Sequence, residues 1–176
     1  MGVRGTSDDA RWELSYRFID NQVDRATHRA VLMRQWTSSF KAGVEINPLV
    51  DEVGLVANWR VLSETARRPA LILGTSSDRI GTDSGQAYFA TISKSLDQEL
   101  GLPIAPWVGV SWSGAEDRLL YPFGASISLA DRISATVQND GVHTHGSMSF
   151  ALPSRWSLTV LAVRLEDIGI SVGTRF

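Results

Sequence analysis

A histidine and a serine in this chain are spaced so that they could act together as a base and a nucleophile. His145 and Ser147 are separated by one residue in the segment 142–149 (VHTHGSMS). In an extended strand, residues with this spacing point to the same face, about 7 Å apart along the strand. A base beside a hydroxyl is the arrangement that activates a serine for nucleophilic attack. The candidates for a third group that would orient the histidine are Asn58, Asn139 and Glu45, and none has a matching sequence context.

The same segment offers a weaker candidate for a metal site. His143 and His145 alternate, and alternate strand residues can chelate a metal ion. The only other histidine is His28, and no cluster of carboxylates stands nearby in the sequence. We therefore expect no metal and no cofactor. The favoured interpretation is that both histidines are interior polar residues in hydrogen-bond networks, and that the chain is not an enzyme.

Alternation of apolar and polar residues recurs along the whole chain and predicts β-strands. The clearest alternation lies in segments 12–18, 40–46, 53–61, 121–129, 132–138, 156–162 and 168–176. Segments 29–36, 69–75 and 86–93 alternate less cleanly. Short polar turns separate many of these runs, as in hairpins. We predict about twelve strands of nine to eleven residues, although ten or fourteen also fit, and a short helix in 93–100.

Composition excludes several classes of protein. The 176 residues carry a formal net charge of −2, which argues against a nucleic-acid partner. There is no cysteine, so disulfides and thiolate zinc sites are excluded. With 43% hydrophobic residues and a mean hydropathy of −0.04, no run is long enough for a transmembrane helix. A barrel whose alternate residues face lipid would have these values.

The less apolar face of the predicted strands is typical of a narrow barrel interior. It carries charges of both signs together with glycines, and only two of the 17 basic residues are lysines. The predicted lumen-lining residues are Glu13, Arg17, Lys41, Glu45, Asn58, Arg60, Arg132, His143 and His145. Aromatic residues near predicted strand ends indicate interfacial girdles. These are Trp12, Trp36, Trp59, Trp112, Tyr121 and Trp156.

The last strand carries a family resemblance. Ile168, Ile170, Val172 and Thr174 alternate with small or charged residues, and the chain stops on Phe176. This segment resembles the C-terminal strand of bacterial outer-membrane β-barrel proteins. The resemblance implies an all-β, antiparallel, up-and-down transmembrane barrel with both termini in the periplasm.

The same resemblance implies a place for the protein and its partners. The expected location is the outer membrane of a Gram-negative bacterium, in contact with outer-membrane lipid. Ile170, Val172 and Phe176 would form the signal that the barrel-assembly machinery reads, and other envelope proteins are further candidate partners. We expect a barrel domain over 11–176 and a disordered or tag-like tail over 1–10. That tail has no apolar core of the signal-peptide kind. Either this is a mature sequence with an added Met, from which the signal peptide has been removed, or the protein is not exported; we expect the first.

Three functions follow from these observations. The first is a narrow, porin-like transport channel or a structural barrel subunit of an envelope assembly. The second is an outer-membrane lipid hydrolase, because the His-x-Ser pair is similar to that of outer-membrane phospholipases and lipid A deacylases, where it faces lipid. The third is a soluble, lipocalin-like carrier. The polar segment 75–85 matches neither a calcium loop nor a phosphate loop, and we expect a surface loop that folds over the barrel mouth.

Overall fold

Strands with one apolar and one polar face make up most of the computed structural model, which describes residues 10–20 and 23–176. The first strands are β1 (Trp12–Ile19), β2 (His28–Gln35), β3 (Phe40–Asn47), β4 (Glu52–Leu62), β5 (Ala70–Ser77) and β6 (Gln86–Ser93). They are followed by β7 (Ile104–Ser113), β8 (Arg118–Leu120), β9 (Phe123–Ala130), β10 (Ile133–Asn139), β11 (Thr144–Ala151), β12 (Trp156–Val163) and β13 (Asp167–Arg175). Two short helices, α1 (Asp24–Thr27) and α2 (Asp97–Leu100), lie in connections.

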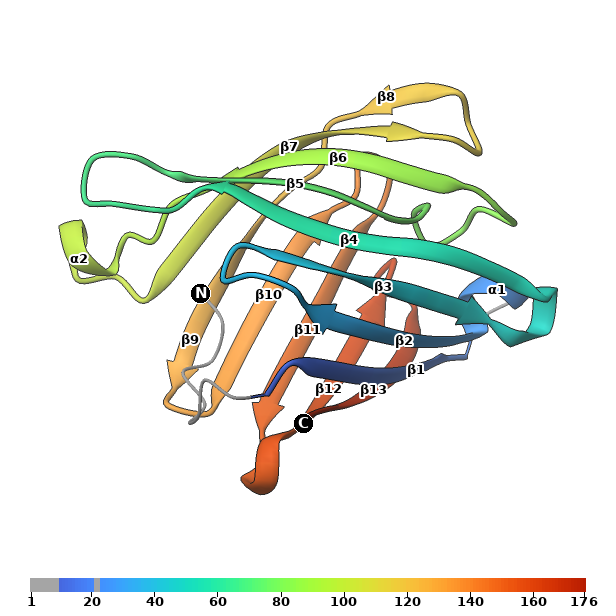
Figure 1. The fold of residues 1–176 in the computed structure, drawn as a ribbon. Coiled ribbons are helices and arrows are strands. Elements are labelled where there is room, and N and C mark those ends of the chain that lie inside the picture. The colour runs from blue at the N-terminus through green and yellow to red at the C-terminus, as the bar shows by residue number, and fades with distance from the viewer. Residues whose placement is uncertain (1–9, 21–22) are drawn as a thin grey trace.

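The strands close into a barrel (Figure 1). Neighbours in the chain pair antiparallel, and β1 pairs with β13 to close the ring. β8 and β9 pair with β7 in one continuous register, with Ser111 opposite Leu120 and Val108 opposite Phe123. Pro122 lies between them and lacks the N–H that a ladder needs, so they form one strand interrupted at that point. The described residues thus close a ring of twelve strands, which confirms the predicted fold class.

The start of β1 and the residue after β13 lie together at one end of the barrel. The amide of Trp12 donates to the carbonyl of Phe176 at 2.9 Å, and the amide of Phe176 donates back at 3.0 Å. The connection that contains α2 lies at this end, and the connection that contains α1 lies at the opposite end (Figure 1). α2 falls within the predicted helical segment but spans only four residues.

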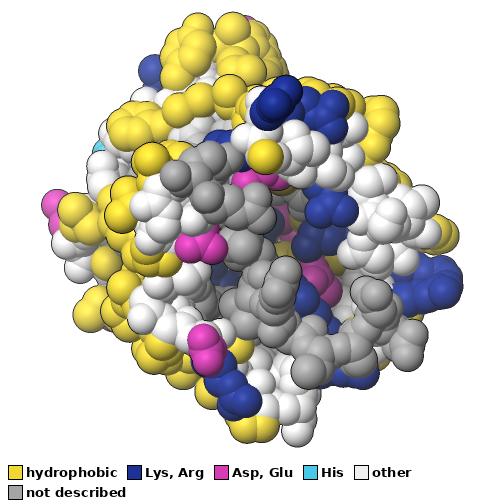
Figure 2. Space-filling model, turned by 90° about the vertical axis from the view of Figure 1, so that its left-hand side faces the viewer, with side chains coloured by type: hydrophobic (Ala, Val, Ile, Leu, Met, Phe, Trp, Pro, Cys, Tyr) yellow, Lys and Arg dark blue, Asp and Glu magenta, His cyan; other side chains and the backbone are white. Residues whose placement is uncertain are grey.

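The apolar face of the strands points outward. Trp12, Leu14, Tyr16 and Phe18 of β1 are exposed, whereas Ile19 at its end is completely buried. Ile168 of β13 is 67% exposed, which would be costly in water for a large apolar side chain. Figure 2 shows hydrophobic side chains around the outside of the barrel and acidic and basic side chains in its central hollow. This arrangement is that of a barrel surrounded by lipid.

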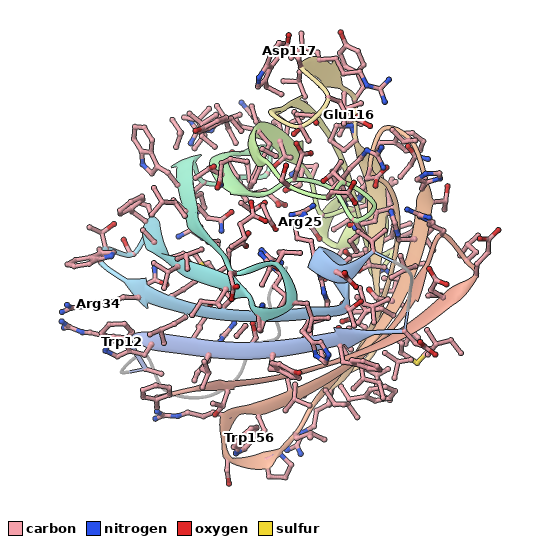
Figure 3. The ribbon with its side chains drawn as sticks, turned by 90° about the vertical axis from the view of Figure 1, so that its right-hand side faces the viewer. Trp12, Arg25, Arg34, Glu116, Asp117 and Trp156 are labelled. Carbon is pink, nitrogen blue, oxygen red and sulfur yellow. The ribbon has the colours of Figure 1, made fainter. Side chains whose placement is uncertain are left out.

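Aromatic residues mark both ends of this apolar surface. Trp12, Trp36, Trp59 and Trp156 lie at strand ends near the chain termini and are exposed. Trp12 and Trp156 project outward in Figure 3, where Arg34 lies beside Trp12. The exposed Trp112 and Tyr121 lie toward the opposite end. Their positions are those of interfacial aromatic girdles. Among the residues described, no helix is both long and apolar enough to span a membrane.

Candidate functional site in the barrel lumen

Ion pairs join nearby strands on the inner face of the barrel. The carboxylate of Glu13 on β1 accepts from Lys41 Nζ on β3 at 2.7 Å and from Arg175 Nε on β13 at 2.8 Å. Glu45 of β3 is completely buried and pairs with the guanidinium of Arg29 on β2. These pairs form because alternate residues of every strand face inward, so opposite charges from strands that are adjacent or one strand apart meet in a confined space.

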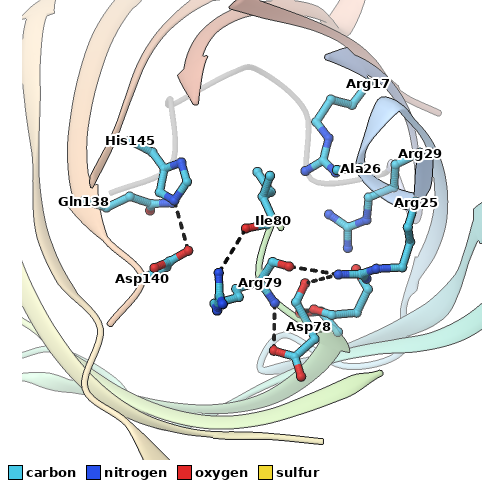
Figure 4. A pocket seen from close by; sticks show the side chains of 12 residues that line it. Arg17, Arg25, Ala26, Arg29, Asp78, Arg79, Ile80, Gln138, Asp140 and His145 are labelled. Atoms are coloured by element: carbon cyan, nitrogen blue, oxygen red, sulfur yellow. Dashed lines mark hydrogen bonds and ion pairs between the residues drawn. The ribbon is translucent and has the colours of Figure 1, made fainter. Parts of the chain in front are cut away.

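The β5–β6 loop, residues 78–85, enters the barrel at the end that holds α1. Figure 4 shows Ile80 and Arg79 between the opposite walls of the barrel. Gly81 and Gly85 have φ angles of +107° and +108°, which residues with a side chain rarely adopt, and these glycines let the loop turn back. The loop therefore narrows the mouth, whereas residues 75–77 of the predicted loop segment 75–85 belong to β5.

One arginine holds this loop in place. Arg25 of α1 is only 3% exposed and donates four hydrogen bonds to the loop. Its Nε donates to the Thr82 carbonyl at 2.7 Å. Its Nη2 donates to the carbonyls of Asp78 and Arg79 at 3.1 and 2.8 Å and to Thr82 Oγ1 at 2.6 Å. Burial lowers the pKa of Arg25, although nearby carboxylates, chiefly Glu52, oppose that shift.

Two carboxylates fix the walls beside the loop. Asp78 accepts hydrogen bonds from Ser113 Oγ at 2.7 Å and from the Ala115 amide at 3.0 Å, which joins the loop to the end of β7. Asp140, in the β10–β11 turn, accepts from the Val142 amide at 2.9 Å. Burial alone would raise the pKa of Asp140, but its hydrogen bonds to His145 and the turn amides outweigh burial and hold that pKa below its usual value.

A cavity of about 220 Å³ remains between the loop and the barrel wall. Its charged lining residues are Arg17, Arg25, Arg29, Arg79, Asp78 and Asp140, and it also contacts His145. Arg17, Arg29 and Arg25 lie together on one side of the cavity, and Asp140 and His145 lie on the other (Figure 4). The space is polar and smaller than the sites that hold drug-sized ligands.

The geometry of His145 does not favour hydrolysis. Its ring is buried, its Nδ1 accepts a hydrogen bond from the Arg164 amide at 3.2 Å, and its Nε2 lies 3.0 Å from Asp140 Oδ2. Because Nδ1 accepts, Nε2 carries the proton and donates to the carboxylate. Neither ring nitrogen is then available to take a proton from Ser147. The histidine instead belongs to a hydrogen-bond network of the interior, and the lipid-facing pair of the hydrolases is not formed.

The predicted lumen residues differ in where the structure places them. Glu13, Arg17, Lys41, Glu45, Asn58 and His145 lie on the inward face of their strands. His143 is half-buried in the turn before β11. Arg60 and Arg132 are both exposed, and their place in the lumen stays a prediction. Arg60 lies at the rim and donates to the Ser38 carbonyl at 2.8 Å, and Arg132 lies in the turn after β9, where alternation no longer sets direction.

Sequence reasoning missed the arginines that matter most to this site. Arg29 belongs to a segment whose alternation is blurred, so its inward direction carried little signal. Arg25 lies in a connection without periodicity, and its role depends on the path of a loop more than fifty residues later. Asp140 reads as an ordinary Asn-Asp-Gly turn, and its contact with His145 follows only from the hairpin geometry. Nothing local in the sequence distinguishes these residues.

Comparisons with known proteins agree with the fold. No protein-family model matches the chain, and no curated protein matches its sequence. Among solved structures, the NanC porin in a rhombohedral crystal form matches with a TM-score of 0.54 at 8% sequence identity, covering 94% of this chain and 98% of that chain. The chain has the fold of a porin-type membrane barrel. At this identity the likeness concerns the fold alone.

The exterior and interior distinguish this barrel from a soluble carrier. A lipocalin-like barrel places its apolar residues inside, around an apolar ligand. Here the exposed Leu55 and Ile170 face outward, and the buried Glu45 faces inward. The outward apolar surface therefore argues against a soluble, lipocalin-like carrier.

Proposed function

We propose that the protein is a narrow outer-membrane pore for ions and small polar solutes, with the β5–β6 loop restricting one mouth. The observation that carries this proposal is the charged cavity of about 220 Å³ inside an apolar-surfaced barrel. Because charges of both signs line the interior, small polar molecules can exchange their hydration for contacts with the wall.

The terminal strand supports delivery to the outer membrane by the barrel-assembly machinery. β13 turns Ile168, Ile170 and Val172 toward the lipid side, and Phe176 is 56% exposed at its end. An apolar face that ends in an accessible ring presents what a receptor for nascent barrels can bind.

The test of the pore is electrical. Protein refolded into detergent is first checked for a heat-dependent shift in gel mobility and is then added to a planar lipid bilayer. We expect small, discrete conductance steps, which detergent alone and heat-unfolded protein do not produce. Folded protein that inserts and gives no steps at any applied voltage would refute the pore and leave a structural role in the envelope.

A further inference from the structure

Two arginines stand directly opposite each other inside the barrel. Arg17 of β1 pairs in register with Arg29 of β2, and both line the cavity. Side chains that are opposite on neighbouring strands start about 5 Å apart at Cβ, and like charges in such positions destabilise a sheet. Arg25 lines the same side of the cavity and adds a third positive charge (Figure 4). This arrangement is costly unless something negative offsets it.

Most carboxylate oxygens around the cavity are already engaged elsewhere. Glu45 accepts from Arg29 Nε at 2.9 Å through its Oε2, while its Oε1 is buried without a hydrogen-bond partner. Asp78 accepts from Ser113 and Ala115, and Asp140 accepts from His145 and the amides of its own turn. Arg25 is bound by the loop carbonyls and lies 4.0 Å from Glu52. None of these acids reaches the guanidinium of Arg17.

Arg17 therefore differs from its neighbours. Within residues 10–20 and 23–176, no hydrogen bond or ion pair to its guanidinium is found, and its Nε is shielded from solvent without a partner. An N–H donor that is shielded from water without a hydrogen-bond partner is unfavourable. The flat, forked guanidinium matches the two oxygens of a carboxylate or phosphate.

We propose that the cavity binds a small oxyanion, carrying a phosphate or carboxylate group, on Arg17 with support from Arg29. This inference rests on the proposed function, because the anion would reach the cavity through the lumen. The anion would offset the repulsion between the two arginines, and the cavity volume of about 220 Å³ restricts the ligand to a small solute.

The test measures stabilisation by inorganic phosphate. Folded protein in detergent is heated in steps, and the temperature at which half of it loses its folded gel mobility is recorded at rising phosphate, with chloride at matched ionic strength. We compare the wild type, Arg17→Gln, and the control Arg132→Gln, which alters an exposed arginine of the β9–β10 turn. The control accounts for the general stabilisation of proteins by phosphate.

We expect the wild type and Arg132→Gln to show the same saturable rise in half-unfolding temperature. Arg17→Gln should lose the saturable rise, and in chloride it should unfold at or above the wild-type temperature because a like-charge contact is gone. A phosphate response of Arg17→Gln equal to that of the wild type would overturn the site. If Arg17→Gln does not fold, Arg17→Lys replaces it, because lysine keeps the positive charge but lacks the forked guanidinium. A half-saturating phosphate concentration roughly tenfold higher than that of the wild type would support the site. An unchanged half-saturating concentration would overturn it.

The two proposals fail in different ways. A barrel that conducts but shows no phosphate response dependent on Arg17 keeps the pore and removes the anion site. A barrel that shows this response but never conducts keeps the site and removes the pore.

Discussion

Replacing Arg25 with methionine should release the loop that narrows the mouth of the barrel. The substitution keeps much of the side-chain volume but removes all four hydrogen bonds to residues 78–82. A hydrogen bond that involves a charged group contributes about 1.5–3 kcal/mol. Since the four bonds share one guanidinium, and the carbonyls regain water when the loop opens, we count about 3 kcal/mol in total. That amount shifts the ratio of closed to open loop by roughly a hundredfold.

Trypsin cleavage after Arg79 measures the open loop directly. Arg79 is held in the mouth by its ion pair with Glu116, so cleavage requires the loop to leave. When opening is fast relative to cleavage, the cleavage rate follows the open population. We expect Arg25→Met to be cut after Arg79 roughly a hundredfold faster than the wild type and to give larger conductance steps.

Arg60→Met provides the matched control. Arg60 is exposed at the opposite rim and donates a single hydrogen bond to the Ser38 carbonyl. This variant should be cut after Arg79 at the wild-type rate. If Arg25→Met folds, as judged by its gel shift, and is nevertheless cut no faster than the control, then Arg25 does not hold the loop and the reasoning is refuted.

Three further predictions concern folding, pH and insertion. Gly43→Ala should fail to refold in detergent, because its Cβ would lie 1.9 Å from the Leu32 carbonyl oxygen. The control Gly146→Ala, whose Cβ would have its nearest neighbour at 3.9 Å, should refold. Equal yields of folded protein on gels would contradict this prediction. Because the folded-state pKa of Asp140 is lowered, its stabilising contribution is present above about pH 4, the usual pKa of an aspartate, and is lost as the pH falls through the folded-state pKa. Guanidinium unfolding of Asp140→Asn should thus show a stability deficit at pH 6 that shrinks below pH 4, and a deficit independent of pH would argue against this role. Deleting Phe176 should reduce the amount of folded barrel in the outer-membrane fraction of cells while leaving refolding in detergent largely intact, and unchanged cellular insertion would remove the proposed assembly signal.

The architecture could be predicted because it depends on a repeated local pattern. In β1 Leu14 faces outward and Arg17 faces inward, and in β13 Ile170 faces outward and Gly169 faces inward. Such period-two alternation is a local property, so it can be recognised even when the strand boundaries are predicted with errors. Inside and outside could be assigned from composition, because arginine and glycine on one face suit a confined lumen. Arg132 shows the limit of that logic: alternation assigns a direction only while the strand continues.

The site could be predicted only in part, since it is assembled by a loop. Arg17 and His145 follow from strand parity, but the hydrogen-bond partners of His145 do not. Arg25 becomes important through backbone carbonyls of residues 78–82, which have no side-chain signature in the sequence. His145 has a hydroxyl two residues away, yet its partner is Asp140, because the tight turn brings that carboxylate back over the strand.

The pairing of β1 with β13 also determines how the chain must fold. These two strands are the first and last of the described sequence, so their ladder closes the longest loop in the molecule and has the largest entropic cost. Until β13 is in place, β1 and β12 each have one edge without a partner strand, and such edges can bind other chains. A barrel shortened at its C-terminal end would therefore be an open, aggregation-prone sheet instead of a smaller pore. Ring closure is in this sense a kinetic checkpoint, which the chain can pass only after β13 has been made.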